Sequence, residues 1–108
     1  MTEALIAFTT FANEADAARV ARVLVEERLV ACANLLTGAR SIYRWEGKVA
    51  DEQEVVVLLK TRKQDWTALL SRLHELHPYE TPEFLVLPVA RGNKLYLDWL
   101  EQSVEPPL

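Results

Sequence analysis

The stretch that decides the fold is RLVACANLLTGARSIYRWEGKVADEQEVVVLLKT, residues 28–61. It reads as a β-hairpin whose two arms, each of about fifteen residues, meet in a tight turn at Glu46-Gly47, where Gly47 supplies the backbone freedom of a two-residue turn. Gly38 interrupts the first arm and predicts a bulge or bend. The second arm ends in the apolar run 55–59. Such an unbroken run is typical of a strand that is buried on both faces.

The length of this hairpin bears on assembly. An arm of about fifteen residues reaches about 50 Å, whereas a domain of this size is only about 30 Å across. The half near the turn must therefore project beyond the domain, with Ile42, Tyr43 and Trp45 beside free backbone edges. Because such edges pair with other chains, the hairpin predicts oligomerisation. The alternative is that the bend at Gly38 folds the arm back onto its own domain.

Composition narrows the class of protein. The 108 residues predict a single domain, residues 1–108. A net charge of −4, without a cluster of basic residues, argues against a nucleic-acid partner. The single cysteine excludes an internal disulfide and fits a reducing compartment. No secretory signal or membrane span is recognisable, so we expect a cytoplasmic protein without a membrane partner.

The rest of the chain predicts a strand and a helix on each side of the hairpin, and a last helix. The expected elements are a strand over 4–11, a helix capped by Asn13, a helix over 64–76, a strand over 83–89 with Pro88 marking an edge, and a helix after Gly92-Asn93. This order is that of an α+β, ferredoxin-like split βαβ fold with an antiparallel sheet. Right-handed crossovers place the two main helices on one sheet face, so the last helix or a neighbouring subunit must cover the other.

Apolar side chains at helical spacing predict which faces of the later helices are buried. The residues expected to point inward are Trp66, Leu69, Leu70, Leu73 and Leu76 of the helix over 64–76, and Leu95, Tyr96, Trp99 and Leu100 of the last helix.

Residues 77–83, HPYETPE, form the most pointed chemical signal. Two prolines stiffen a loop that displays the imidazole of His77, the phenol of Tyr79 and two carboxylates. Imidazole and carboxylate groups together bind Cu²⁺ or Zn²⁺, and they also transfer protons near neutral pH. The alternative is that His77 and Tyr79 only cap a helix and pack a turn. Cys32 is either a small core residue or a soft metal ligand.

Other side chains suit a small ligand without indicating catalysis. Tyr43, Trp45 and Trp99 make an aromatic set that fits either a subunit interface or a ligand-binding wall. Lys60 is either the cationic partner of an anionic ligand or the polar end of a strand. The sequence holds no Gly-rich phosphate loop, no HExxH pair and no GxSxG elbow. We therefore do not expect an enzyme.

Four segments together match a known family. They are RLVACAN at 28–34, YRWEGK at 43–48, LKT at 59–61 and HPYETPE at 77–83. In these segments, in their order and over nearly its whole length, the chain resembles the CutA divalent-cation tolerance family. The resemblance implies a cytoplasmic homotrimer of ferredoxin-like subunits, similar in architecture to the PII signalling proteins. It also implies a role in tolerance of copper and other divalent metals, without an obligatory cofactor.

Carried over by position, the resemblance implies a cluster near subunit boundaries. Its members are His77 as the metal ligand and, in a ligand-binding cleft, Cys32, Tyr43, Trp45, Glu46, Lys60, Tyr79 and Glu83. Some relatives carry a cysteine near the end of the first strand and a second histidine before the His-Pro-Tyr segment. This chain has Thr9 and Leu76 there, so any Cu²⁺ or other divalent ion should be held weakly, by His77 and nearby oxygens.

Three functions stay open at this point. The first is a trimeric protein that binds divalent metal ions through His77. The second is a PII-like sensor or assembly module, which would bind a small anionic metabolite in the inter-subunit cleft with Lys60, Trp45 and Tyr43. The third, ranked last because no nucleophile accompanies the candidates, is an enzyme that uses Tyr79, His77 and Glu83 as acids and bases.

Overall fold

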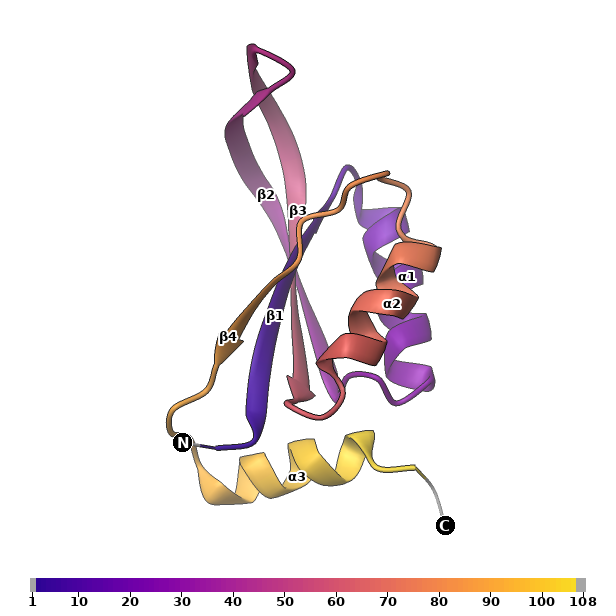
Figure 1. The fold of residues 1–108 in the computed structure, drawn as a ribbon, viewed down its shortest axis with the longest axis vertical. Helices are drawn as coiled ribbons and strands as arrows, with labels where there is room; N and C mark the ends of the chain where they lie inside the picture. Colours follow the sequence, from indigo (N-terminus) through magenta and orange to yellow (C-terminus); the bar gives the residue numbers. More distant parts are fainter. Residues whose placement is uncertain (1, 107–108) are drawn as a thin grey trace.

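The structure, a computed structural model, describes residues 2–106. Its elements, in chain order, are β1 (Ala4–Phe11), α1 (Glu14–Glu26), β2 (Cys32–Trp45), β3 (Lys48–Arg62), α2 (Trp66–Leu76), β4 (Leu85–Pro88) and α3 (Lys94–Val104). The strands form one sheet in the order β2-β3-β1-β4, and all neighbours are antiparallel. Helices α1 and α2 lie together on one face of the sheet (Figure 1). The predicted α+β, ferredoxin-like arrangement is confirmed.

Local signals in the sequence account for the element boundaries. Asn13 precedes α1, and its side-chain oxygen accepts the backbone N–H of Asp16 at 2.8 Å, which makes it the predicted N-cap. Helix α2 ends at Leu76, because Pro78 disfavours helical geometry at His77, whose backbone is extended. Pro88 lies in β4, an edge strand of the sheet, where its missing N–H costs no ladder bond.

The β2–β3 hairpin projects from the domain, as its length predicts. Strand β3 pairs with β1 only from Val55 to Arg62, so residues 48–54 pair with β2 alone. The molecule is accordingly elongated, 47 × 26 × 22 Å, with the hairpin at one end of its long axis (Figure 1). The turn residues Glu46 and Gly47 have φ of 49° and 78°, as in a type I′ turn. A register shift between Leu36 and Ala39, with Gly38 at φ 81°, is the predicted bulge.

The core lies between the sheet and its two helices. Successive strand residues point to opposite faces, so the odd-numbered residues of β1 and β3 face α1 and α2. The fully buried side chains of this layer are Ala7, Phe11, Val57 and Leu59 of the sheet with Ala17, Val20, Leu24, Leu69 and Leu73 of the helices.

The opposite face of the sheet is apolar and uncovered, and we call it the open sheet face. None of the elements described for residues 2–106 lies across its middle (Figure 1). Register places Leu85 opposite Phe8 and Leu87 opposite Ile6, so these four side chains share the face. Leu85 is 61% exposed and Leu87 57%. The face consists of Ile6, Phe8, Leu36, Val56, Leu58, Leu85 and Leu87.

Helix α3 crosses one end of the sheet rather than covering its open face (Figure 1). It buries Leu100 and Val104 against Ala4 and Ala31. The prediction that Leu95, Tyr96 and Trp99 point inward is wrong, because the two contact positions on the sheet are alanines, and they accept the Leu100–Val104 side of the helix. Leu95 is 80% exposed, and the side chains of Tyr96 and Trp99 are also exposed.

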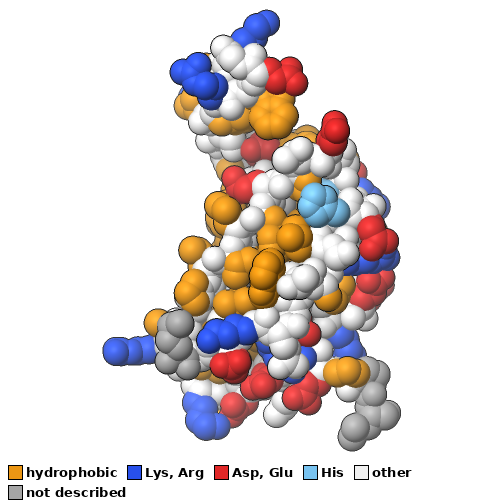
Figure 2. All heavy atoms as spheres, in the orientation of Figure 1, with side chains coloured by type: hydrophobic (Ala, Val, Ile, Leu, Met, Phe, Trp, Pro, Cys, Tyr) orange, Lys and Arg blue, Asp and Glu red, His pale blue; other side chains and the backbone are white. Residues whose placement is uncertain are grey.

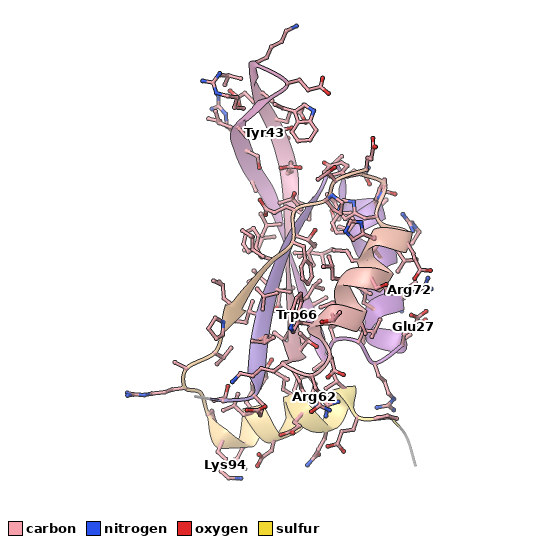
Figure 3. All side chains as sticks on the ribbon, viewed as in Figure 1. Glu27, Tyr43, Arg62, Trp66, Arg72 and Lys94 are labelled. Carbon is pink, nitrogen blue, oxygen red and sulfur yellow. The ribbon has the colours of Figure 1, made fainter. Side chains whose placement is uncertain are left out.

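The inward position predicted for Trp66 is also wrong, since its side chain is 40% exposed. Trp66 is the first residue of α2 (Figure 3), where the helix has only just begun to approach the core. Two of the five residues predicted to line the buried side, Leu69 and Leu73, are fully buried. These two carry the packing of α2 on the sheet.

Two arginines hold the C-terminal end of α3. Arg28 has φ of 61°, follows the end of α1 and donates from Nη1 to the carbonyl oxygens of Ser103 and Glu105 at 3.4 and 3.3 Å. Arg62 is 5% exposed and binds Asp65 at 2.6 Å, with Glu105 at 3.8 Å (Figure 3). Cationic groups near helix C-termini stabilise the unpaired carbonyls there. These contacts fix α3 beside the end of β3.

Candidate functional site

The imidazole of His77 is buried beneath the loop that follows α2. Its Nδ1 accepts the backbone N–H of Tyr79 at 3.1 Å, and its Nε2 lies 2.7 Å from the carbonyl oxygen of Thr10. Since Nδ1 accepts, Nε2 carries the proton and donates it to that carbonyl. The ring also stacks on Phe11, with centroids 4.1 Å apart and planes 13° apart.

Burial lowers the pKa of His77, although the hydrogen bond to Thr10 acts in the opposite direction. The imidazole is therefore neutral at pH 7. Both of its nitrogens are hydrogen-bonded within the chain, so a metal ion reaches a lone pair only if the bond to Tyr79 N–H or to Thr10 opens. Within residues 2–106, no group of three or more His, Cys, Asp or Glu side chains is arranged to hold a metal ion.

The phenol of Tyr79 connects the loop to the root of the hairpin. Its hydroxyl donates to Oε2 of Glu54 at 2.8 Å, and Glu54 is only 8% exposed. Burial and this hydrogen bond raise the pKa of Tyr79 well above its ordinary value. Burial and the charge of Glu54 likewise raise the pKa of Glu83. Burial and the charges of Glu52 and Glu54 raise the pKa of Tyr43. These five residues form what we call the acid–phenol cluster.

Glu54 is the member of this cluster that sequence reasoning missed. Its only signal is its place directly before the apolar run 55–59, where a carboxylate is drawn into a buried strand. The cluster joins three of the predicted site residues, Tyr43, Tyr79 and Glu83, and adjoins His77 through Tyr79. Chemically it is an electronegative group of carboxylates and phenols at the root of the hairpin, a set of oxygens that suits a hard cation.

Cys32 and Lys60 lie at the opposite end of the sheet. They are cross-strand partners on β2 and β3. Lys60 Nζ donates to the hydroxyl of Tyr96 on α3 at 3.1 Å, and this bond is the main reason that the pKa of Lys60 is raised. Cys32 is half-buried, with its Sγ 3.6 Å from Oδ1 of Asn34.

Trp45 and Glu46 lie at the tip of the hairpin, where Trp45 is 55% exposed. Trp45 pairs with Lys48, and Lys60 stands near the other end of β3, roughly 40 Å away at 3.3 Å per residue. The predicted cluster is thus divided among the tip, the root and the base of the hairpin (Figure 3 labels Tyr43 on its projecting part). Trp45 and Lys60 can contribute to one site only if they come from different copies of the chain.

Comparison with known proteins adds to this geometry. Residues 5–103 match the family model described as CutA1 divalent ion tolerance protein. The chain is 45% identical over 98 residues to the divalent-cation tolerance protein CutA of Thermus thermophilus, covering 91% of this chain and 95% of that one. No helix among residues 2–106 is long and apolar enough to cross a membrane.

Solved structures agree in fold and in sequence. CutA from Xylella fastidiosa superposes with a TM-score of 0.93 at 38% identity, covering 96% of this chain and all 100% of that one. A protein described as the periplasmic divalent cation tolerance protein CutA from Archaeoglobus fulgidus gives 0.91 at 31% identity, with 94% and 99% covered. The motifs at 28–34, 43–48 and 77–83 lie within the matched residues. This chain belongs to the family of CutA1 divalent ion tolerance proteins.

Proposed function

We propose that the chain acts in divalent-cation tolerance as a cytoplasmic homotrimer that binds divalent metal ions directly. The observation that carries the assembly is the open sheet face. It is an apolar surface at the middle of a four-stranded sheet, and Leu85 and Leu87 alone are 61% and 57% exposed on it. Monomeric proteins rarely leave such a patch uncovered. The number of copies is the one that the family resemblance implies.

The projecting hairpin supports the same proposal. Outside its pairing with β2, the segment 48–54 has a free backbone edge, and Ile42, Trp45 and Val49 beside it are 62%, 55% and 66% exposed. A free edge with large apolar side chains is a template for another chain. A second copy that covers the hairpin and the open sheet face removes both surfaces from water.

The assembly is tested by size-exclusion chromatography with light scattering. We expect a particle of about three times the 12.3 kDa mass of the chain. Leu87→Lys places a charge on the open sheet face without disturbing the core of one chain, so it should give smaller particles. Trp66→Lys, at an equally solvent-accessible aromatic on α2, is the matched control and should leave the mass unchanged. A wild-type mass near 12.3 kDa would overturn the assembly.

Metal binding rests on the imidazole of His77 and on the adjoining oxygens of the acid–phenol cluster. The family description and the Thermus thermophilus relative both name divalent cations. Binding at Nδ1 requires that the ring release the N–H of Tyr79, a bond of 3.1 Å between groups three quarters or more shielded by the loop and β1. That cost, in addition to the lack of a second histidine, favours weak binding.

The metal site is tested by calorimetric titration with Cu²⁺. Wild-type protein should show one saturable site per chain, and His77→Ala should remove it. His74→Ala is the matched control, because His74 is an exposed histidine of α2 only three residues away. Circular dichroism establishes that each variant is folded. Copper affinity that is unchanged in a folded His77→Ala protein would show that the ligand is not His77.

A further inference from the structure

Lys60 differs from the other paired lysines of the chain. Lys63 lies 3.8 Å from a carboxylate oxygen of Glu3, and Lys94 lies 2.7 Å from one of Asp98. Among residues 2–106, Lys60 has no carboxylate within ion-pair distance, and its hydrogen-bond partner is the neutral hydroxyl of Tyr96. An ammonium group has three N–H donors, so two remain for another acceptor. The groups that act on its charge are Tyr96 and Cys32, and neither is a carboxylate.

The position of Lys60 makes this missing counter-charge consequential. Its residue number is even, so on β3 it follows Val56 and Leu58 along the open sheet face. If another copy covers that face, the ammonium loses water. A charge that is buried without a partner is strongly unfavourable, whereas a charge-assisted hydrogen bond to an anion offsets the loss. The assembled protein therefore needs an anion at this point.

Two aromatic rings stand beside the ammonium. Tyr96 and Trp99 lie with their centroids 5.3 Å apart and their planes tilted by 38°, and they are 41% and 45% exposed. Lys60 Nζ is 3.1 Å from the Tyr96 hydroxyl but 5.3 Å from the centre of the ring. The ammonium thus lies at the hydroxyl edge and leaves the ring faces free. Free aromatic faces bind a planar ring by offset or edge-to-face packing.

We propose that a small organic anion, a carboxylate or phosphate attached to a planar ring, binds at Lys60, Tyr96 and Trp99 on the boundary between copies. The anionic group accepts from the two remaining N–H groups of Lys60, and the ring packs on the aromatic pair. This inference rests on the proposed assembly, because it is the covering of the open sheet face that makes the counter-charge necessary. The site is separate from the acid–phenol cluster, at the opposite end of β3.

Thermal unfolding with four probes tests the site. Benzoate and phenyl phosphate carry both an anion and a ring, and acetate and inorganic phosphate carry the anion alone. At millimolar concentration, the first pair should raise the Tm of the wild-type assembly by several degrees through mass action, and the second pair by less. The larger shift within each pair tells whether the head group is a carboxylate or a phosphate.

Three variants assign the effect to residues. Lys60→Met keeps the aliphatic stem and removes the charge, so it should weaken binding of the ring-bearing probes by about tenfold or more. Tyr96→Phe keeps the ring and should weaken it less. Lys63→Met, which removes a lysine that is paired with Glu3, is the matched control and should bind as the wild type does. Without a probe, the Lys60→Met assembly should be at least as stable as the wild type.

The outcomes separate this inference from the proposed assembly. A wild-type particle of 12.3 kDa overturns both. A trimer whose Tm none of the four probes raises, or whose Tm rises equally in Lys60→Met, overturns the anion site alone. A Lys60→Met trimer that is less stable than the wild type without a probe shows that a carboxylate of the neighbouring copy already pairs with Lys60. That result also overturns the anion site.

Discussion

Thr9 and Thr61, two threonines with fully buried side chains, differ in their hydrogen bonding. The hydroxyl of Thr61 on β3 donates to the carbonyl oxygen of Leu29 at 2.8 Å. The hydroxyl of Thr9 on β1 has no partner among the described residues. A buried hydroxyl without a hydrogen bond carries its full desolvation cost, whereas a bonded one contributes to stability.

Thr9→Val should therefore raise the free energy of unfolding by about 1 kcal/mol, because valine has the same shape and no hydroxyl. Thr61→Val is the matched control and should lower it by about 1 kcal/mol, since the carbonyl of Leu29 loses its donor. Urea denaturation at one fixed protein concentration measures both. If the two substitutions shift the midpoint in the same direction, the hydroxyl of Thr9 has a partner after all.

His77 links stability to pH with a definite sign. Burial lowers its pKa in the folded chain below the value near 6.5 of an unfolded histidine. As the pH falls through about 6.5, the unfolded chain therefore takes up a proton before the folded chain does, and stability decreases. The fall ends once the pH is below the folded pKa.

The expected result is that wild type loses more stability than His77→Gln between pH 7.5 and 5.5. Glutamine replaces the imidazole with a group that does not titrate. His74→Gln, at an exposed position, should behave like the wild type. Equal losses in the wild type and in His77→Gln would show that the imidazole does not titrate differently on unfolding.

Single residues were predictable where their signal is local. The cap at Asn13 and the turn at Gly47 depend on neighbours a few positions away, and the sequence contains those neighbours. The contact between Tyr79 and Glu54 joins residues 25 apart in the chain. It exists because the loop after α2 reaches the root of the hairpin, and no spacing rule in one sequence expresses that distance.

At the scale of elements, the hairpin turn contains a strained position beside an unstrained one. Glu46 adopts φ of 49°, a conformation that costs most residues about 1–2 kcal/mol but is tolerated by asparagine and glycine. Gly47, at φ 78°, has open space around it, so a methyl group there would meet strain and no clash. Asn-Gly is the sequence that such a turn favours.

Glu46→Asn should accordingly stabilise the protein by about 0.5–1 kcal/mol, and Gly47→Ala should destabilise it by about 1 kcal/mol. Both residues are at the exposed tip, so neither substitution alters the core. Thermal unfolding by circular dichroism, at one protein concentration, compares them. A stabilising Gly47→Ala would mean that the turn is not type I′ in solution.

The elements themselves were predictable, but the orientation of α3 was not. Its apolar residues occur on more than one side: Leu97, Leu100 and Val104 are on one, and Leu95 and Trp99 on the other. Helical periodicity identifies a stripe only when the remaining positions are polar. The side that packs was decided by Ala4 and Ala31, small residues far away in the chain.

At the scale of the whole molecule, the open sheet face makes stability depend on protein concentration. Because assembly covers surface that a single folded chain exposes, raising the concentration should raise the Tm of the wild type. Leu87→Lys should show a Tm that is lower and nearly independent of concentration. Scanning calorimetry over a hundredfold range of concentration measures both, and a flat wild-type Tm would contradict self-association.

The place of β1 at the centre of the sheet has a consequence for biosynthesis. Its two neighbours are β3 and β4, so the first strand to leave the ribosome receives its last partner only when residues 85–88 have emerged. Until then the nascent polypeptide exposes the aliphatic run 55–59 and the unpaired side of β1. Slowed translation before residue 85 should therefore prolong chaperone binding, whereas a pause after it should not.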